Sequence, residues 1–237
     1  VGRGSVNHNT RKFHAKNTDP ERSHLNITYC EENIKAVYHE LFDEALALYN
    51  SKQTRADRKI KDYYEKIRAS KQEKTFHEII LQVGNKDDMH TGSDEGSLAV
   101  EILEEYMAGF RERNPQLSVF SAHLHMDEAT PHLHIDFIPF TTGSKRGLET
   151  RVSLKQALAA QGFQGGSRGD TEWNQWVRSE KDQLSLVMQR HGIEWEKKDT
   201  HEKHLSVLDY KKEQRTKEIA ALETVKAEKE SEVAEQE

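Results

Sequence analysis

The stretch HLHMDEATPHLHIDFIPF, residues 123–140, decides the fold prediction because it combines two strand patterns with four histidines and three carboxylates. From His132 to Asp136 polar and aliphatic side chains alternate, so the histidines face one side of a strand and the aliphatic residues face the other. The six residues MDEATP between His125 and His132 are polar and form a turn. We therefore expect an antiparallel hairpin with one apolar face and one face rich in histidine.

Three histidines of this hairpin are predicted to meet. His132 and His134 stand about 7 Å apart at Cα on one face of their strand, and hairpin pairing returns His125 beside them. Imidazole nitrogens at this separation can reach to about 2.1 Å from a shared ion. One histidine would be explained by packing. Three in phase, with Asp127 and Glu128 in the turn, instead indicate a divalent metal site with open positions, because neutral imidazole is a poor core residue and clustered imidazolium ions repel.

The rest of the chain alternates helical and strand patterns. Residues 1–29 are polar and predict loop. The expected elements are helices over 34–69, 94–113, 153–160 and about 173–191, and strands over 74–83, 116–126 and 131–140. From about residue 202 the chain is rich in Lys and Glu with sparse aliphatic residues, which predicts an exposed helix. The fold class is therefore α+β: an antiparallel sheet with helices packed on it, plus an extended C-terminal helix.

The charge distribution permits binding to nucleic acid despite a net charge of −6. Residues 1–30 carry five Lys and Arg against two acidic residues, and residues 143–169 carry five against one. Phosphate binding depends on such local patches and not on the total charge. The single cysteine, Cys30, excludes an intrachain disulfide and fits a reducing cytosol. No apolar run approaches the roughly 20 residues of a membrane helix, so we expect a cytoplasmic protein.

Two motifs resemble a known family. His132-Leu133-His134 with a third histidine nearby is similar to the HUH endonucleases, which nick single-stranded DNA at replication and transfer origins. The longer segment HMDEATPHLH (125–134) fits the pattern H-x-D-E-x-x-P-H-x-H and resembles the Mob/Pre plasmid mobilisation relaxases, the MobV group. Near the N-terminus, HNTRKF (8–13) and DPERSHLN (19–26) resemble that family's first motif and the basic segment after it.

The resemblance implies an HUH-type sheet and a metal-dependent DNA relaxase that nicks and religates one strand at the transfer origin of a plasmid or integrative element. It implies that His8 is the nucleophile and forms a covalent 5′-phosphoramidate, and that Arg11 steadies charge on the phosphate. Glu128 would complete the metal coordination or accept a proton from His8. Three nitrogen ligands suit zinc, nickel, cobalt or manganese, and the resemblance favours manganese or magnesium held by His125, His132 and His134.

Several side chains are candidates for contacts to DNA, single-stranded or hairpin, at such an origin. They are Arg3, Lys12, Arg22, His24, Asn26, Lys145 and Arg146. Ordinary surface charge explains any one of the basic residues equally well, and His24 and Asn26 fit a structural role equally well. Tyrosine serves as the nucleophile in most HUH enzymes, and this chain offers Tyr29, Tyr38, Tyr49, Tyr63, Tyr64, Tyr106 and Tyr210 as alternatives to His8.

We expect a relaxase domain over residues 1–200 and the start of a longer helical region over residues 201–237, through which the chain would form a homodimer. Only seven residues precede His8, so the domain is expected to lack the strand that precedes the first motif in the family. Two other functions fit the same residues. A metal-dependent phosphodiesterase would use activated water and leave no covalent adduct. A non-catalytic factor for origin binding or recombination would bind DNA without needing the histidines.

Overall fold

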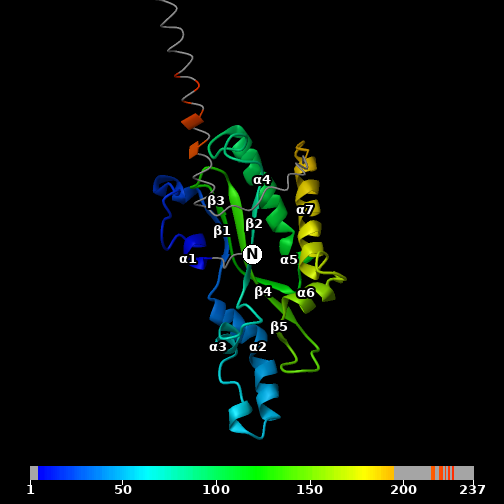
Figure 1. Ribbon diagram of the computed structural model, residues 1–237. Helices are drawn as coiled ribbons and strands as arrows, with labels where there is room; N and C mark the ends of the chain where they lie inside the picture. Colours follow the sequence, from blue (N-terminus) through cyan, green and yellow to red (C-terminus); the bar gives the residue numbers. More distant parts are fainter. Residues whose placement is uncertain are drawn as a thin grey trace, which may run out of the picture. The chain divides into compact units, whose positions relative to one another are not determined.

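The centre of the fold is an antiparallel sheet with the strand order β1-β3-β4-β2 (Figure 1). The computed structural model describes residues 5–194 and seven positions between 215 and 226. The strands are β1 (Ile27–Glu31), β2 (His77–Gln82), β3 (Leu117–His125), β4 (His132–Thr141) and the short β5 (Arg151–Val152), which pairs with the end of β4. The predicted hairpin is β3–β4, and its register pairs His125 with His132 and His123 with His134.

Helices surround this sheet. They are α1 (Val6–Asn9), α2 (Ile34–Ser51), α3 (Tyr63–Arg68), α4 (Asp94–Ala108), α5 (Phe110–Arg113), α6 (Leu154–Ala160) and α7 (Glu172–Arg190), with 3-10 turns η1 (Pro20–Leu25) and η2 (Ala56–Arg58). Polar side chains cap the main helices; the Ser93 side chain, for example, accepts from Gly96 N at the start of α4. Among the described residues, no helix is long and apolar enough to cross a membrane.

One face of the sheet is apolar except at His77, which pairs with Phe137. Leu124, Leu133, Ile135 and Phe137 are fully buried in a core that also contains residues of α4, α6 and α7. In Figure 1, α4 and α7 lie next to each other against the sheet. The alternation seen in the sequence of β4 therefore supplies the core side of the strand, as predicted.

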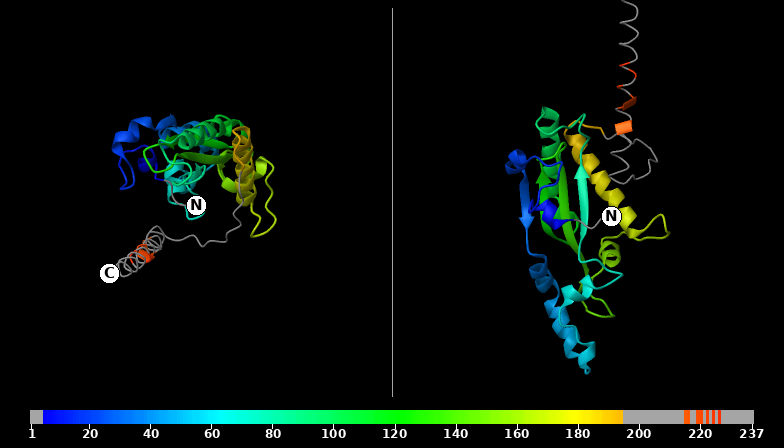
Figure 2. Two further views of the ribbon diagram at one scale, coloured as in Figure 1. Left: turned by 90° about the horizontal axis from the view of Figure 1, so that it is seen from above. Right: turned by 60° about the vertical axis from the view of Figure 1, so that its left-hand side comes forward.

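The opposite face changes character along β4. Its alternate residues run from His132 and His134 through Asp136 to Ile138, and Ile138 belongs to a second apolar cluster with residues of α2 and α3. These two helices lie together near β5 in Figure 1, and Figure 2 shows the same helices from two further sides. The histidine end of the same face is contacted by the single turn α1. Helices therefore cover the apolar end of this face, and the histidine end is left for the N-terminal segment.

The predicted fold class is correct, but three local predictions were wrong. The helix expected over 34–69 is two helices, because the segment between Ser51 and Ile60 contains no apolar residue except Ala56 and has little to bury. The helix expected over 94–113 is interrupted at Gly109. The loop expected over 1–29 contains α1, η1 and the start of β1, an edge strand that pairs with β3.

The chain divides into two compact units, Val1–Trp195 and Glu196–Glu237. Seven positions of the second unit fall within the described residues (215, 216, 219, 220, 222, 224 and 226), and all seven are helical. The domain boundary near residue 200, the missing first strand and the dimer contact through residues 201–237 stay predictions.

Candidate metal and nucleophile site

The hairpin brings three buried histidine rings together. His125 ends β3, and His132 and His134 begin β4. The ring centroids of His125 and His134 are 4.7 Å apart, those of His132 and His134 5.0 Å, and those of His125 and His132 5.2 Å. The sequence predicted this meeting from strand parity and the short turn alone.

Each ring is held by an oxygen acceptor at one nitrogen. The acceptors are the Asn9 carbonyl for His125 Nε2 (2.8 Å), the Thr130 carbonyl for His132 Nδ1 (2.9 Å) and the Glu78 carboxylate for His134 Nδ1 (2.7 Å). Because these oxygens only accept, the ring nitrogen facing each of them carries the proton, and the lone pair stands on the other nitrogen. His125 Nδ1 and His134 Nε2 are buried without a protein partner. His132 Nε2 lies 3.8 Å from Glu128 Oε1.

Burial keeps the imidazoles of His125 and His132 neutral. It lowers the pKa of His125 to about 3 and also lowers the pKa of His132. Neutral imidazole is the form that binds metal, because the proton and the ion compete for the same lone pair. Three inward lone pairs, two of them on buried nitrogens that no protein group satisfies, therefore fit a divalent cation.

His8 approaches this cluster from α1. The Ser5 side chain caps that turn by accepting from His8 N. The next residue, Asn9, is only 2% exposed, and its side-chain amide donates to Glu78 Oε1 (2.8 Å) and Asp136 Oδ2 (2.9 Å). Since the Asn9 carbonyl also accepts from His125, the turn that carries His8 is tied to both strands of the hairpin and to β2.

Arg11 connects His8 to the turn of the hairpin. Its Nη1 lies 3.2 Å from His8 Nε2, its Nε donates to Asp127 Oδ2 (2.8 Å), and its Nη2 donates to Asp127 Oδ1 and to Glu128 Oε1 (3.0 Å). Arg11 has a positive φ of 53°, which turns the chain sharply after α1. A guanidinium can only donate, so its contact with His8 favours a lone pair at Nε2.

Burial and hydrogen bonds determine whether His8 and Asp127 are charged. Burial and the Arg11 guanidinium lower the pKa of His8, so its ring is neutral near pH 7. Burial alone would raise the pKa of Asp127, but hydrogen bonds from Arg11 and Ser23 outweigh it and hold that pKa well below the usual range. Glu128 Oε1 lies 3.5 Å from His8 Nε2, and its other oxygen accepts from Asn17 (2.5 Å).

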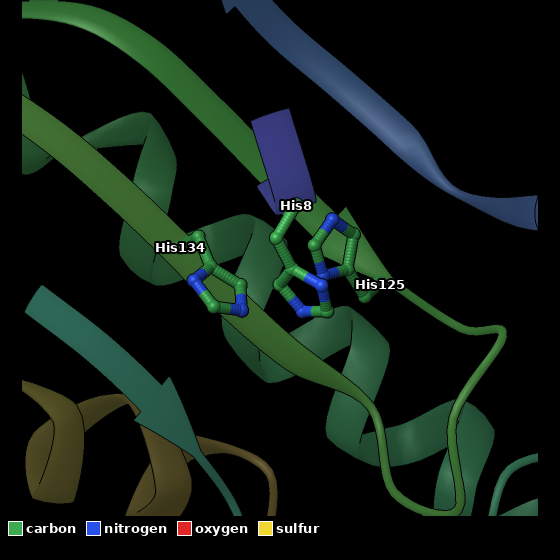
Figure 3. A group of neighbouring side chains, drawn as sticks. All are labelled: His8, His125 and His134. Carbon is green, nitrogen blue, oxygen red and sulfur yellow. The ribbon is translucent and has the colours of Figure 1, made fainter. Parts of the chain in front are cut away.

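Two overlapping sets of side chains could hold a cation. In each set the ligand atoms lie within 4.8 Å of one another. The first set is His125, Glu128 and His132; the second is His8, His125 and His134. Figure 3 shows the second set, with His8 reaching from α1 toward the two strand histidines. Small rotations of these rings would bring the nitrogens to bonding distance of one ion.

The residues that hold the rings were not found from sequence. Glu78 orients His134, while Asp136 accepts from Asn9. Burial raises the pKa of Asp136 to about 6. Glu78 points to the same face of the sheet from β2 as the histidines do from β4. Only the pairing of β2 with β4 shows that these side chains are neighbours.

Four predicted DNA contacts lie in the N-terminal segment around the site. Lys12 is exposed and 3.8 Å from Glu31, and Arg22 is paired with Asp19. His24 is exposed, with Nδ1 2.7 Å from the Glu21 carbonyl. Asn26 Oδ1 accepts from Met126 N (2.7 Å), so this side chain holds the chain against the end of β3.

Two further predicted DNA contacts are not brought to the histidines. Lys145 and Arg146 lie in an exposed loop beyond Thr141, at the end of β4 opposite His132. Arg3 lies outside the described residues. The DNA-binding role of all seven residues stays a prediction.

The described tyrosines are engaged elsewhere. Tyr38, Tyr63 and Tyr106 are buried in the two apolar cores. Tyr64 packs on Tyr38, the Tyr49 ring lies under Lys66, and Tyr29 packs against the core on the helix-covered face. Tyr210 lies outside the described residues. Of the candidate nucleophiles among the described residues, His8 lies beside the histidine cluster, whereas these tyrosines pack elsewhere.

Comparisons with known proteins agree with this geometry. The profile of the plasmid recombination enzyme family (Mob_Pre) matches residues 5–212. A plasmid recombination enzyme from Streptococcus agalactiae is 25% identical over 221 residues, which is 88% of this chain and 36% of the relative. The chain thus spans about a third of the length of that relative.

Solved structures of a MobM relaxase domain (MOBV; Mob_Pre) share the fold. One, Mn-bound at pH 4.6 with 22 nucleotides of pMV158 oriT DNA, is 23% identical with a TM-score of 0.51, covering 87% of this chain and 90% of that one. Another, Mn-bound at pH 6.5 with 23 nucleotides, is 23% identical with a TM-score of 0.50 and covers 89% and 90%. The family predicted from the two motifs is confirmed: the chain belongs to the Mob_Pre family of plasmid recombination enzymes.

Proposed function

We propose that this chain is a metal-dependent DNA relaxase, which cuts one strand at the transfer origin of a plasmid or integrative element and later rejoins it. The observation that carries the proposal is the cluster of three buried imidazoles with inward lone pairs, with His8 and Arg11 beside it. Such a cluster has no packing purpose, because its unsatisfied nitrogens cost free energy unless a cation occupies the space.

Manganese or magnesium is the proposed ion. His125, His132 and His134 would hold it, with Glu128 as a carboxylate ligand or neighbour. The bound ion would polarise the scissile phosphate and offset the charge that develops on its oxygens. The Mn-bound relaxase domains that share this fold support the choice of metal.

His8 is the proposed nucleophile. Its neutral ring attacks phosphorus through a lone pair, so a nitrogen–phosphorus bond forms and the bond between phosphorus and the 3′ oxygen breaks. The 3′ oxygen takes up a proton, and the 5′ phosphate stays on His8 as a phosphoramidate. Rejoining reverses these steps, because the free 3′ hydroxyl attacks the same phosphorus and releases the imidazole.

Arg11 and Glu128 are proposed to support this exchange. As phosphate enters, one of its oxygens can take over the Arg11 hydrogen bond that now occupies His8 Nε2, which frees the lone pair. The Glu128 carboxylate, 3.5 Å from His8 Nε2, stabilises the positive charge that the ring gains on attack. Arg3, Lys12, Arg22, His24, Asn26, Lys145 and Arg146 stay the proposed DNA contacts.

A nicking assay tests the proposal. Supercoiled plasmid carrying the DNA that flanks the gene for this chain is incubated with protein and Mn²⁺, and a labelled oligonucleotide from the same region reports any covalent adduct. We expect nicking and an acid-labile adduct with the native chain, and loss of both with His8→Ala. His14→Ala, at an exposed histidine in the same segment, is the matched control and should nick normally.

The assay separates the other two functions. Cleavage without any protein–DNA adduct would indicate hydrolysis by water. An adduct that survives in His8→Ala would assign the nucleophile to another residue. DNA binding that persists without metal, with no cleavage under any condition, would indicate a binding factor and overturn the relaxase proposal.

A further inference from the structure

We propose that His8 is also a metal ligand, and that with His125 and His134 it forms a second cation position that excludes the first. Nitrogen-preferring ions would take this position and withdraw the nucleophile. The existence of this second ion position does not depend on the proposed function. The inhibition of nicking by an ion bound there does rest on the proposed function.

The geometry of the three rings carries the proposal. Their ligand atoms lie within 4.8 Å of one another. The His8 ring centroid is 6.0 Å from that of His125 and 6.1 Å from that of His134, at interplanar angles of 86° and 71°. Rings that meet edge-on in this way direct their nitrogens into a shared space instead of stacking (Figure 3).

The two positions compete because the proposed Mn²⁺ position, which also includes His132 and Glu128, shares His125 and His134 with the position that includes His8. Its Nε2 is bonded to the Asn9 carbonyl, which leaves Nδ1 as its one available lone pair. One lone pair binds one ion at a time, so an ion held with His8 displaces an ion held with Glu128 and His132.

The surrounding charge allows a cation next to His8. The positive charge of the Arg11 guanidinium, which lies 3.2 Å from His8 Nε2, repels a cation bound there. Arg11 is itself paired with the carboxylates of Asp127 and Glu128, and the Glu78 carboxylate stands behind His134. These three carboxylates exceed the single guanidinium charge, so the group retains negative charge to balance an ion.

The ligand sets differ in the ions that they select. The position with Glu128 offers a carboxylate oxygen, which suits Mn²⁺ and Mg²⁺. The position with His8 offers only imidazole nitrogens, which suit Zn²⁺, Ni²⁺ and Cu²⁺. Zn²⁺ is therefore expected to bind His8 and occupy the lone pair that would otherwise attack phosphorus, whereas Mn²⁺ leaves that lone pair free.

The test measures metal affinity in the absence of DNA. Zn²⁺ binding to the metal-free chain is followed by competition with a chromophoric chelator, and Mn²⁺ binding by electron paramagnetic resonance. We expect His8→Ala and His8→Gln to weaken Zn²⁺ binding at least about tenfold and to leave Mn²⁺ binding within about twofold. His14→Ala controls for an exposed histidine, His125→Ala should weaken both ions, and thermal melting shows whether each variant is folded.

Three results would overturn the second position. Equal Zn²⁺ affinity with and without His8, or no Zn²⁺ binding at all, would mean that His8 is not a ligand. A parallel loss of Mn²⁺ affinity in His8→Ala would mean that one position takes both ions.

A second arm tests the consequence. In Mn²⁺-driven nicking, added Zn²⁺ should inhibit, and excess Mn²⁺ should restore the rate. Zn²⁺ that binds through His8 without slowing nicking would overturn the inhibitory role. Absence of nicking with Mn²⁺ alone would instead count against the proposed function, and the affinity measurements would still decide whether the second position exists.

Discussion

Asn9 joins the nucleophile turn to the metal-binding strands through three hydrogen bonds. Its carbonyl accepts from His125 Nε2, and its amide donates to Glu78 and Asp136. The side-chain amide is therefore proposed to hold the turn in place, so that its main-chain carbonyl meets the ring of His125 and His8 reaches the cluster.

Asn9→Ala keeps the main-chain carbonyl but removes the amide that anchors the turn and binds Glu78, the partner of His134, so Mn²⁺ affinity should fall by about tenfold or more. It should also lower kcat for nicking, because His8 loses its anchor, with a smaller effect on KM for DNA. The exposed neighbour Asn7→Ala is the control and should change neither quantity. Unchanged Mn²⁺ affinity in Asn9→Ala would show that the turn does not depend on this residue.

His77 provides a second test at the scale of a residue, on the opposite face of the sheet. It stacks on Phe137 with ring centroids 6.1 Å apart, and its Nδ1 is buried without a protein partner. Burial lowers its pKa from the ordinary 6.5 to about 4. Between these values the unfolded chain binds a proton that the folded chain does not, so His77 reduces stability as the pH falls through this window.

His77→Leu should therefore flatten the fall in the free energy of unfolding between pH 7.5 and pH 5, by about 1–2 kcal/mol. Urea unfolding at several pH values measures this slope, and the comparison of slopes removes any change in packing. His39→Leu, at an exposed histidine, is the control. A slope equal to that of the native chain would show that His77 is protonated in the folded state as readily as in the unfolded one.

At the scale of elements, the start of α4 supports the turn of the hairpin. Gly96 lies in α4, and a Cβ placed there would come within 2.1 Å of the His90 carbonyl oxygen. The next residue of that loop, Thr91, donates its N–H to the Ala129 carbonyl (3.0 Å), directly after Glu128. The missing side chain at residue 96 thus lets the loop pack closely enough to hold the turn.

Gly96→Ala should destabilise the fold by roughly 1–3 kcal/mol through overpacking, although alanine in a helix interior is ordinarily favoured by about 1 kcal/mol. Because the displaced loop holds Ala129, Mn²⁺ affinity should fall as well. Gly109→Ala is the control, since a Cβ there meets only the flexible end of Arg113. A gain in stability in Gly96→Ala would mean that the loop moves aside at little cost.

At the scale of the whole chain, metal binding should couple to folding, because the candidate ligands come from β3, β4 and the turn between them, and their supports from α1 and β2. An ion that binds only the folded state at about 100 times its dissociation constant stabilises by about 2.7 kcal/mol. For a chain of this size, Mn²⁺ should then raise the Tm by about 5–10 °C.

Thermal unfolding with Mn²⁺ and after chelation measures this shift. His134→Ala should remove most of it, while the exposed His24→Ala should leave it intact. An identical Tm with and without Mn²⁺ would show that the cluster does not bind the ion.

The sequence determined the hairpin and the histidine trio because both depend on local rules. Side-chain alternation along a strand has a fixed period, and a turn of six residues brings His125 beside His132 with little freedom in register. The motif HMDEATPHLH identified the family on these residues, together with the motif near the N-terminus. The local breaks in the helices and the short edge strand β1 were missed because their signals are weak over so few residues.

Tertiary structure alone decided which groups hold those histidines. Glu78 is 56 residues from His134 along the chain, and Asn9 is 116 residues from His125. No local period links such positions, because their contact depends on β2 pairing with β4 and on α1 settling over the open end of the sheet. The residue types alone thus determine which side chains can bind a metal. The packing of distant segments determines which ring nitrogen carries the proton, which groups lie next to each ring, and how His8 approaches them.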